Sequence, residues 1–202
     1  MAATFQDIAD NVSIDINQGT TLDAIILNKV YEAHRSMERN NSFEYMTQQR
    51  VLSQPLGVST FTFTPGWKRV KMIRYDYEGT FQYLEQVHPA DPGRVEEAPP
   101  KYWYLTGAST ANLFLTFTEA TDLTIIETVT RQTYAPGESD WLTDQGQDLL
   151  HYMTMAAMGI PTKDSELITL VAPQIELHLQ TTLDLDENLR RGTVRPEIRF
   201  GT

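Results

Sequence analysis

The segment Trp67-Lys-Arg-Val-Lys-Met-Ile-Arg-Tyr-Asp-Tyr77, with Glu78-Gly79 and Thr80-Phe-Gln-Tyr-Leu84 after it, decides the fold class of the chain. Its β-branched and aromatic side chains alternate with polar ones, which is typical of a strand with one buried face. Glu78-Gly79 separates the two runs by the two residues of a tight turn. The sequence therefore predicts an antiparallel hairpin in the middle of the chain.

Short runs of the same kind surround this hairpin and predict a β-rich middle region, because each run ends at residues typical of turns. A further hairpin is expected to join Arg50–Leu52 to Val58–Phe63 across Pro55-Leu56-Gly57. Phe61 and Phe63 would then share one face. Since hairpin-length gaps join most runs, the sheet should be mainly antiparallel. The remaining strands are expected at Lys101–Leu105, Asn112–Phe117 and Leu123–Val129, beyond an exposed proline-rich loop at residues 88–100.

Helices are predicted before this region. Phe5, Ile8, Ala9 and Val12 recur at intervals of three and four residues, which indicates an amphipathic helix. A longer helix is expected after Gly19, with Thr20 or Thr21 as its N-cap. Its expected inward face carries Leu22, Ile25, Ile26, Val30, Ala33 and Met37, interrupted at Lys29.

Two more helices are predicted after the β-rich region. Asp144 with Gln147 three positions later has the pattern of a capping box, and the helix that follows should end near Gly159. The last helix is expected from about Lys163 to Asn188, with a kink where Pro173 removes a backbone donor. Its expected inward side chains are Leu167, Leu170, Val171, Ile175, Leu179 and Leu183.

These elements define an α+β fold, in which the N- and C-terminal helices form a bundle and the middle of the chain is mainly antiparallel and β-rich. A chain of 202 residues has the length of one ordinary domain. We therefore expect a single domain over residues 1–189, helical at 1–45 and 137–189 and β-rich at 46–136. An extended C-terminal arm is expected at residues 190–202, because this segment has a glycine, a proline and no periodicity.

The charge of the chain is divided unevenly. The formal net charge is −11, which argues against binding that depends on neutralising phosphates. Residues 190–202 nevertheless carry +3, whereas residues 1–189 hold 12 basic and 26 acidic residues, a charge of −14. This segment is either a frayed chain end or an arm that leaves the body and docks on an acidic partner or on another copy, and the opposite charges of body and arm favour docking. Its arginines would pair with carboxylates, and Ile198 and Phe200 would be its apolar anchors.

Little in the sequence indicates catalysis. There is no cysteine, no nucleotide-binding motif and no histidine spacing typical of a metal site among His34, His88, His151 and His178. His151 has Asp148 and Tyr152 nearby on a predicted helix, but a surface histidine is the simpler interpretation. We therefore expect no enzyme activity, no catalytic residue, no cofactor and no metal. No apolar run could span a membrane and no secretory signal is present, so we expect the chain to stay in a cytoplasm.

The order of elements resembles the head-to-tail adaptor (connector) family of tailed bacteriophages, which is related in plan to tail tubular protein A. The segments that carry the resemblance are Trp67–Tyr75, Pro100–Tyr104, the strand pair Leu113–Phe117 and Leu123–Thr128, and Ser139–Leu142 leading into Leu149–Met153. In that family a Trp-Leu pair precedes the helix that begins the C-terminal bundle, and Trp141-Leu142 matches it.

The resemblance implies a structural protein of the virion neck. It implies a homo-oligomeric ring, typically of twelve copies, that binds below the portal protein and attaches tail or nozzle proteins. DNA would pass through the channel without specific binding, and the acidic charge agrees with this role because like charges repel. The arm would dock on the portal, which places Arg190, Arg191, Arg195, Ile198, Arg199 and Phe200 in the interface.

Three other interpretations stay open at this point. One is a different neck or tail protein, such as a tail terminator or a tail-tube component. Another is a carbohydrate-binding β-module that uses Tyr102 and Tyr104, which alternation places on the face opposite Trp103. The third is an enzyme whose activity depends on His151.

Overall fold

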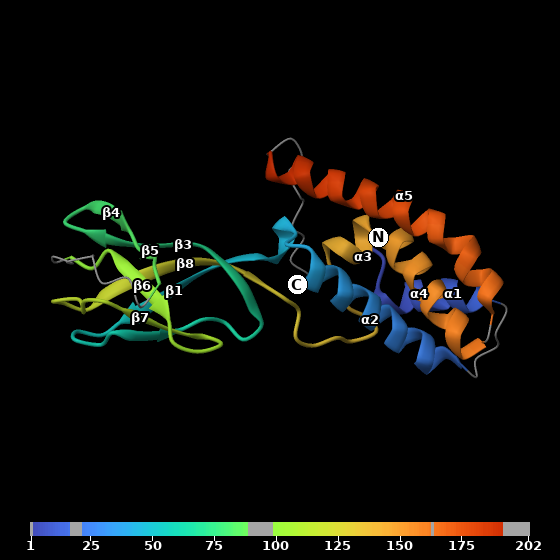
Figure 1. Cartoon of the computed structure of the whole chain (residues 1–202), viewed down its shortest axis with the longest axis horizontal. Coiled ribbons are helices and arrows are strands. Elements are labelled where there is room, and N and C mark those ends of the chain that lie inside the picture. The colour runs from blue at the N-terminus through green and yellow to red at the C-terminus, as the bar shows by residue number, and fades with distance from the viewer. Residues whose placement is uncertain (1, 17–21, 89–98, 163, 192–202) are drawn as a thin grey trace. The chain divides into compact units, whose positions relative to one another are not determined.

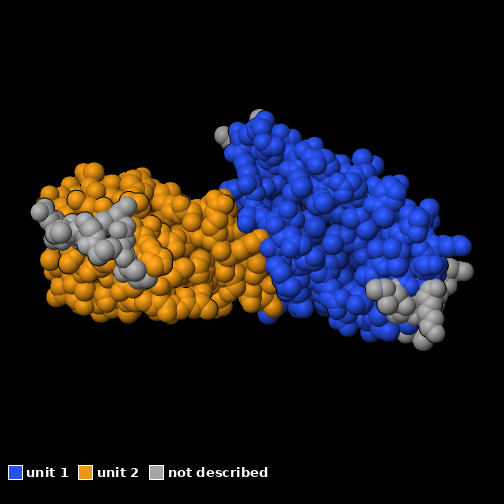
Figure 2. All heavy atoms as spheres, in the orientation of Figure 1, with its two compact units in different colours: residues 1–44, 133–202 blue, residues 45–132 orange. Residues whose placement is uncertain are grey.

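The computed structural model describes residues 2–16, 22–88, 99–162 and 164–191. The chain forms two compact units, one made of residues 1–44 and 133–202 and the other of residues 45–132 (Figure 2). We call them the helical unit and the β unit. Where the sequence predicted one domain, the structure thus has two compact units, and the β unit has nearly the bounds of the predicted β-rich segment.

The predicted α+β fold is confirmed, since helices from both ends of the chain form one unit and mainly antiparallel strands form the other. None of the described helices is long and apolar enough to cross a membrane. Of the arm predicted at residues 190–202, residues 192–202 lie outside the described residues, as does most of the proline-rich loop, from residue 89 to residue 98.

The helical unit is built around one central helix. Its elements are α1 Phe5–Asp15, α2 Asp23–Asn40, α3 Trp141–Gln145, α4 Gln147–Thr162 and α5 Ser165–Arg190 (Figure 1). Helix α4 contacts each of the other four, so elements from both ends of the chain share one core. Its fully buried members include Phe5, Ile8, Val12, Ile26, Val30, Leu142, Leu149, Leu150 and Met158.

The predicted apolar face of α1 is confirmed, because all four of its members are buried. The helix begins with a capping box, in which Thr4 Oγ1 accepts the N–H of Asp7 at 3.2 Å and Asp7 Oδ2 accepts the N–H of Thr4 at 2.8 Å. Helix α2 differs from its prediction. Its N-cap is Leu22, without a side-chain cap, while Thr20 and Thr21 lie outside the described residues.

The buried face of α2 also contains two polar residues that the sequence pattern missed. His34 and Glu38 are buried beside Ile26, Val30, Ala33 and Met37, whereas Ile25 is exposed. The spacing of four residues between Val30, His34 and Glu38 puts them on one side of the helix. His34 and Glu38 are therefore part of the same buried face of α2 as its apolar residues.

The C-terminal helices begin and end at other residues than predicted. The capping box that starts this region is Asp140 with Thr143, not Asp144 with Gln147. Helix α4 continues through Gly159 to Thr162, and Asp164 then caps α5 by accepting the N–H of Leu167 at 3.0 Å. Helix α5 runs across Pro173 without a break.

Helix α5 lies on the surface of its unit more than predicted. Only Val171, Thr182 and Asp186 are buried among its residues, and Leu170, expected inside, is 71% exposed. Leu167, Ile175, Leu179 and Leu183 are half-buried. A polar residue, Asp186, thus occupies a buried position near the end of the helix.

The β unit contains two four-stranded sheets. One has the order β1-β8-β3-β4 and the other β2-β7-β6-β5, and every pairing is antiparallel except β5 with β6. The strands are β1 Thr47–Gln54, β2 Thr60–Thr62, β3 Trp67–Tyr77, β4 Thr80–Tyr83, β5 Glu85–Gln86, β6 Tyr102–Leu105, β7 Thr110–Leu113 and β8 Thr121–Val129. A short 3-10 helix, η2 Glu44–Met46, precedes β1. The core consists of Phe61, Phe63, Ile73, Tyr75, Leu84, Trp103, Ala111, Leu113, Phe117, Leu123 and Ile125.

The two predicted hairpins had different outcomes. The hairpin of β3 and β4 is confirmed, and its turn has positive φ at both Glu78 and Gly79, as a type I′ turn requires. The hairpin across Pro55-Leu56-Gly57 is wrong, because β1 pairs with β8 and β2 pairs with β7 in the other sheet. The side chain of Gln54 donates to the carbonyls of Val58 and Thr60, so a side chain, not a strand ladder, holds the connection.

Candidate functional site

The end of α5 is where the predicted portal-binding arm begins. The arm was predicted to start at residue 190, but α5 continues to Arg190 and Arg191 is its C-cap with helical backbone angles. Arg195, Ile198, Arg199 and Phe200 lie outside the described residues. The first two residues of the predicted arm therefore belong to the end of α5.

Arg190 belongs to the helical body. Its Nε donates to Oδ2 of Asp186 at 2.8 Å, and its guanidinium also donates to the carbonyl of Ser42. Asp186 is buried, and its Oδ1 accepts the N–H of Glu44 at 2.6 Å. Because Ser42 and Glu44 follow α2, this network joins the end of α5 to the end of α2. A docking role for Arg190 would require this network to open.

Arg191 is placed differently. It forms an ion pair with Glu187, one turn earlier on α5, and both side chains are more than half exposed. Exposed pairs of this kind contribute about 0–1 kcal/mol. The guanidinium of Arg191 can therefore exchange Glu187 for another carboxylate at little cost, as a docking residue needs.

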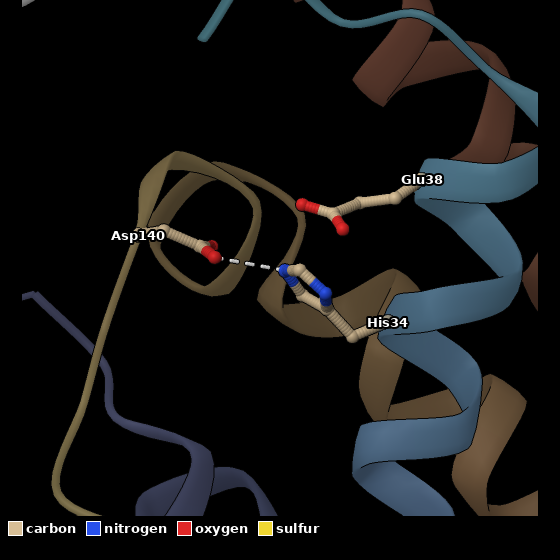
Figure 3. A group of neighbouring side chains, drawn as sticks. All are labelled: His34, Glu38 and Asp140. Carbon is tan, nitrogen blue, oxygen red and sulfur yellow. Dashed lines mark hydrogen bonds and ion pairs between the residues drawn. The ribbon is translucent and has the colours of Figure 1, made fainter. Parts of the chain in front are cut away.

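A second group of polar side chains lies within the helical unit. His34 and Glu38 extend from α2 toward Asp140, the N-cap of α3, and His34 Nε2 lies 2.9 Å from Oδ2 of Asp140 (Figure 3). One ligand atom from each of the three residues lies within 4.8 Å of the others. The exposed fractions are 0% for His34, 2% for Glu38 and 11% for the Asp140 side chain. We call these three residues the His34 cluster.

No protein-family model matches the chain, and no curated protein matches its sequence.

Aromatic rings enclose the imidazole of His34. Phe5 and Tyr134 both meet it edge to face, at centroid distances of 5.2 and 5.4 Å. The hydroxyl of Tyr134 lies 3.2 Å from Nδ1 of His34. The guanidinium of Arg35 covers the ring of Tyr134, 4.6 Å from its centroid. Burial, with the nearby charge of Glu138, raises the pKa of the Tyr31 phenol, whose ring also contacts Phe5 and Tyr134.

Sequence patterns could find only part of the His34 cluster. His34 and Glu38 are four residues apart on a helix, a spacing that a search for paired histidines passes over. Asp140 is more than a hundred residues further along the chain, so no local motif connects it to them. Its own signal was present, since Asp140 and Thr143 have the spacing of a capping box.

Of the two neighbours that the sequence suggested for His151, Tyr152 is in contact with it, but Asp148 is not its carboxylate partner. Nε2 of His151 lies 2.9 Å from Oδ2 of Asp15 on α1, whereas Asp148 lies 3.8 Å from Nδ1 of His178 on α5. Tyr152 stacks on His178 and meets His151 edge to face. These contacts join α4 to α1 and α5, so they fit a role in packing the helices.

The aromatic residues considered for sugar binding are separated by burial. Trp103 is buried in the core of the β unit, as alternation predicted, while Tyr102 and Tyr104 are half-buried. Tyr104 pairs with Phe114 at a centroid distance of 4.8 Å. This leaves a smaller aromatic surface than the three consecutive rings suggested.

Proposed function

We propose that the chain is a structural head-to-tail adaptor of a tailed bacteriophage. Copies of the chain form a ring, typically of twelve, below the portal, and the ring provides a DNA conduit and a platform for tail or nozzle proteins. The observation that carries the proposal lies at the end of α5. There Arg190 is hydrogen-bonded within the acidic helical unit, and a basic segment of the sequence follows directly.

The distribution of charge supports a docking role for this segment. The helical unit holds 18 acidic and 8 basic residues, a charge of −10, whereas the β unit holds 9 acidic and 8 basic residues, a charge of −1. Within the helical unit the basic excess lies at its C-terminal end. A positive extension from an acidic body favours contacts with a neighbouring copy or another acidic protein.

The same charge supports a conduit. Twelve copies at −11 carry −132, and like charge keeps a polyanion from binding to the wall. Because the acidic excess belongs to the helical unit, this unit is the part that would face the DNA. Exposed apolar residues on α5, Ile168, Leu170 and Leu177, provide further surface for contacts between subunits.

The direct test is reconstitution on the portal protein of the same phage. We expect the purified chain to add as a ring to portal assemblies imaged by electron microscopy. A chain that ends at Arg191 should lose this attachment. It should keep its circular dichroism and melting temperature, because the Arg190 network remains.

Each alternative predicts a different result in this test. Attachment of the truncated chain as strong as that of the full chain would overturn the docking role of the basic segment. Rings that bind only tail-tube protein would favour a tail terminator or tube component. A monomer that binds glycans and never the portal would contradict the adaptor proposal.

A further inference from the structure

The His34 cluster has the composition and spacing of a metal-binding site. It offers one imidazole nitrogen and two carboxylates, all within 4.8 Å of one another. Zn²⁺ binds such ligands at about 2.0–2.2 Å, which puts the ligand atoms of a tetrahedral site about 3.4 Å apart. The distance between His34 Nε2 and Asp140 Oδ2, 2.9 Å, is shorter than this value. The upper limit for the distances among all three ligand atoms, 4.8 Å, is longer. Small side-chain movements would complete the geometry.

The surroundings orient the imidazole for this purpose. A histidine that binds a metal through one ring nitrogen usually donates a hydrogen bond from the other. Here the hydroxyl of Tyr134 lies 3.2 Å from Nδ1, so Nδ1–H can donate to it while Nε2 lies 2.9 Å from Oδ2 of Asp140. Phe5 and Tyr134 fix the plane of the ring through edge-to-face contacts.

Asp140 is fixed by its own helix. Its Oδ1 accepts the N–H of Thr143 at 3.0 Å, and its backbone N–H donates to the hydroxyl of Thr143 at 2.8 Å. Its Oδ2 lies 2.9 Å from Nε2 of His34, and a bound cation would replace that contact. Two carboxylates buried this close together repel each other, and a divalent cation would reverse that repulsion.

We propose that His34, Glu38 and Asp140 bind one divalent transition-metal ion, with Zn²⁺ as the best fit. The mixed nitrogen and oxygen donors suit Zn²⁺ and its neighbours better than Mg²⁺ or Ca²⁺, which prefer oxygen alone. His34 Nε2 and one oxygen from each carboxylate are the protein ligands, and a water molecule fills the fourth position. The ion fastens α2 to the start of α3, so its role is to stabilise the helical unit.

The test uses the full chain after treatment with a chelator. Titration with ZnCl₂ in a calorimeter should show one saturable site per chain. Unfolding should shift upward by about 5 °C at a free Zn²⁺ concentration far above Kd. Co²⁺ in place of Zn²⁺ should give the visible absorption of a low-symmetry site, and Nε2 of His34 should shift in ¹⁵N NMR spectra when Zn²⁺ is added.

Two conservative variants and one control locate the site. Asp140→Asn keeps a good N-cap for α3, and Glu38→Gln keeps the shape of the side chain. Each should weaken Zn²⁺ binding by at least about tenfold. His151→Gln, which removes an imidazole that is paired with Asp15 on another helix, should bind Zn²⁺ like the natural chain.

Three outcomes would overturn the proposal. These are the absence of saturable binding by the natural chain at millimolar Zn²⁺, full binding by the Asp140→Asn variant, and an equal loss in His151→Gln. If Glu38→Gln fails to fold, the NMR shift of His34 in the natural chain and the Asp140→Asn titration still decide the question.

Discussion

Arg50 on β1 donates from Nε to Oε1 of Glu127 on β8 at 2.8 Å, and Glu127 is completely buried. The carboxylate also accepts the hydroxyl and the N–H of Thr64. The guanidinium of Arg50 donates in turn to the carbonyl of Thr62, in the other sheet. A charged pair thus joins the two sheets of the β unit.

Removing Arg50 should therefore be costly. Arg50→Met leaves the Glu127 carboxylate buried without its cation, and we expect a loss of about 3 kcal/mol in the free energy of unfolding. The double variant with Glu127→Gln should recover at least about 1 kcal/mol of the loss, because a neutral amide needs no cation. Urea denaturation of the four chains of this cycle measures the coupling. Additive losses would show that the charge pair has no such role.

Asp186 at the end of α5 should matter for stability as Arg50 does in the β unit. Asp186→Ala removes the acceptor for the N–H of Glu44 and the partner of Arg190, with an expected loss of about 2–3 kcal/mol. Asp184→Ala is the matched control, because Asp184 is exposed and bonds only to Gln180 among the contacts described for it. It should cost less than about 0.5 kcal/mol. Equal losses in urea denaturation would contradict the assignment.

Sequence patterns predicted those parts of the fold that depend on near neighbours. The buried stripe of α1 follows from spacing alone, and the turn at Glu78-Gly79 follows from the length of the gap between two alternating runs. Both signals lie within a few residues, where periodicity and turn chemistry act.

Features that depend on distant partners were missed. β1 and β2 flank a turn-like segment, yet each pairs with a strand about fifty or more residues later, and local chemistry does not choose between sheets. The His34 cluster was missed for the same reason, because only the folded structure brings Asp140 close to α2. The prediction ended α5 before Arg190. This residue is held by Asp186 and by Ser42, and Ser42 is far from it in the sequence.

The capping box of α1 should make stability depend on pH. The hydrogen bonds from the backbone and hydroxyl of Thr4 hold the pKa of Asp7 below its ordinary value of 3.8. A lowered pKa in the folded state means that this contribution is present above pH 3.8 and is lost as the pH falls through the folded-state pKa. Thr4→Ala removes the hydroxyl donor but keeps the backbone N–H, which is the larger cause, so the pKa of Asp7 should rise only part of the way toward 3.8. An NMR titration of the Asp7 carboxyl measures it, and an unchanged pKa would contradict the assigned cause.

The turn between β3 and β4 can be improved. Glu78 has φ of 52°, in the left-handed region that asparagine tolerates better than glutamate. Glu78→Asn should therefore raise the free energy of unfolding by about 0.5–1 kcal/mol. Gly79→Ala should have the opposite effect, because φ at Gly79 is 78°. Thermal unfolding of both variants provides the comparison, and the same sign for the two changes would contradict this account of the turn.

The exposed leucines of α5 test whether copies of the chain assemble through this helix. Leu170 and Leu177 are 71% and 60% exposed, and their spacing of seven residues puts them on one side of α5. Leu170→Gln with Leu177→Gln removes apolar surface without changing the charge, so the melting temperature should stay within about 2 °C of the natural value. Ring formation on the portal should nevertheless fall by at least about tenfold, because apolar contacts desolvated in an interface contribute more than the same residues in water.

Ala172→Gln, an exposed position on another side of the same helix, should leave assembly unchanged. Rings that form equally well with all three substitutions would place the subunit contacts elsewhere, whereas a loss caused by Ala172→Gln alone would assign them to the opposite side of α5.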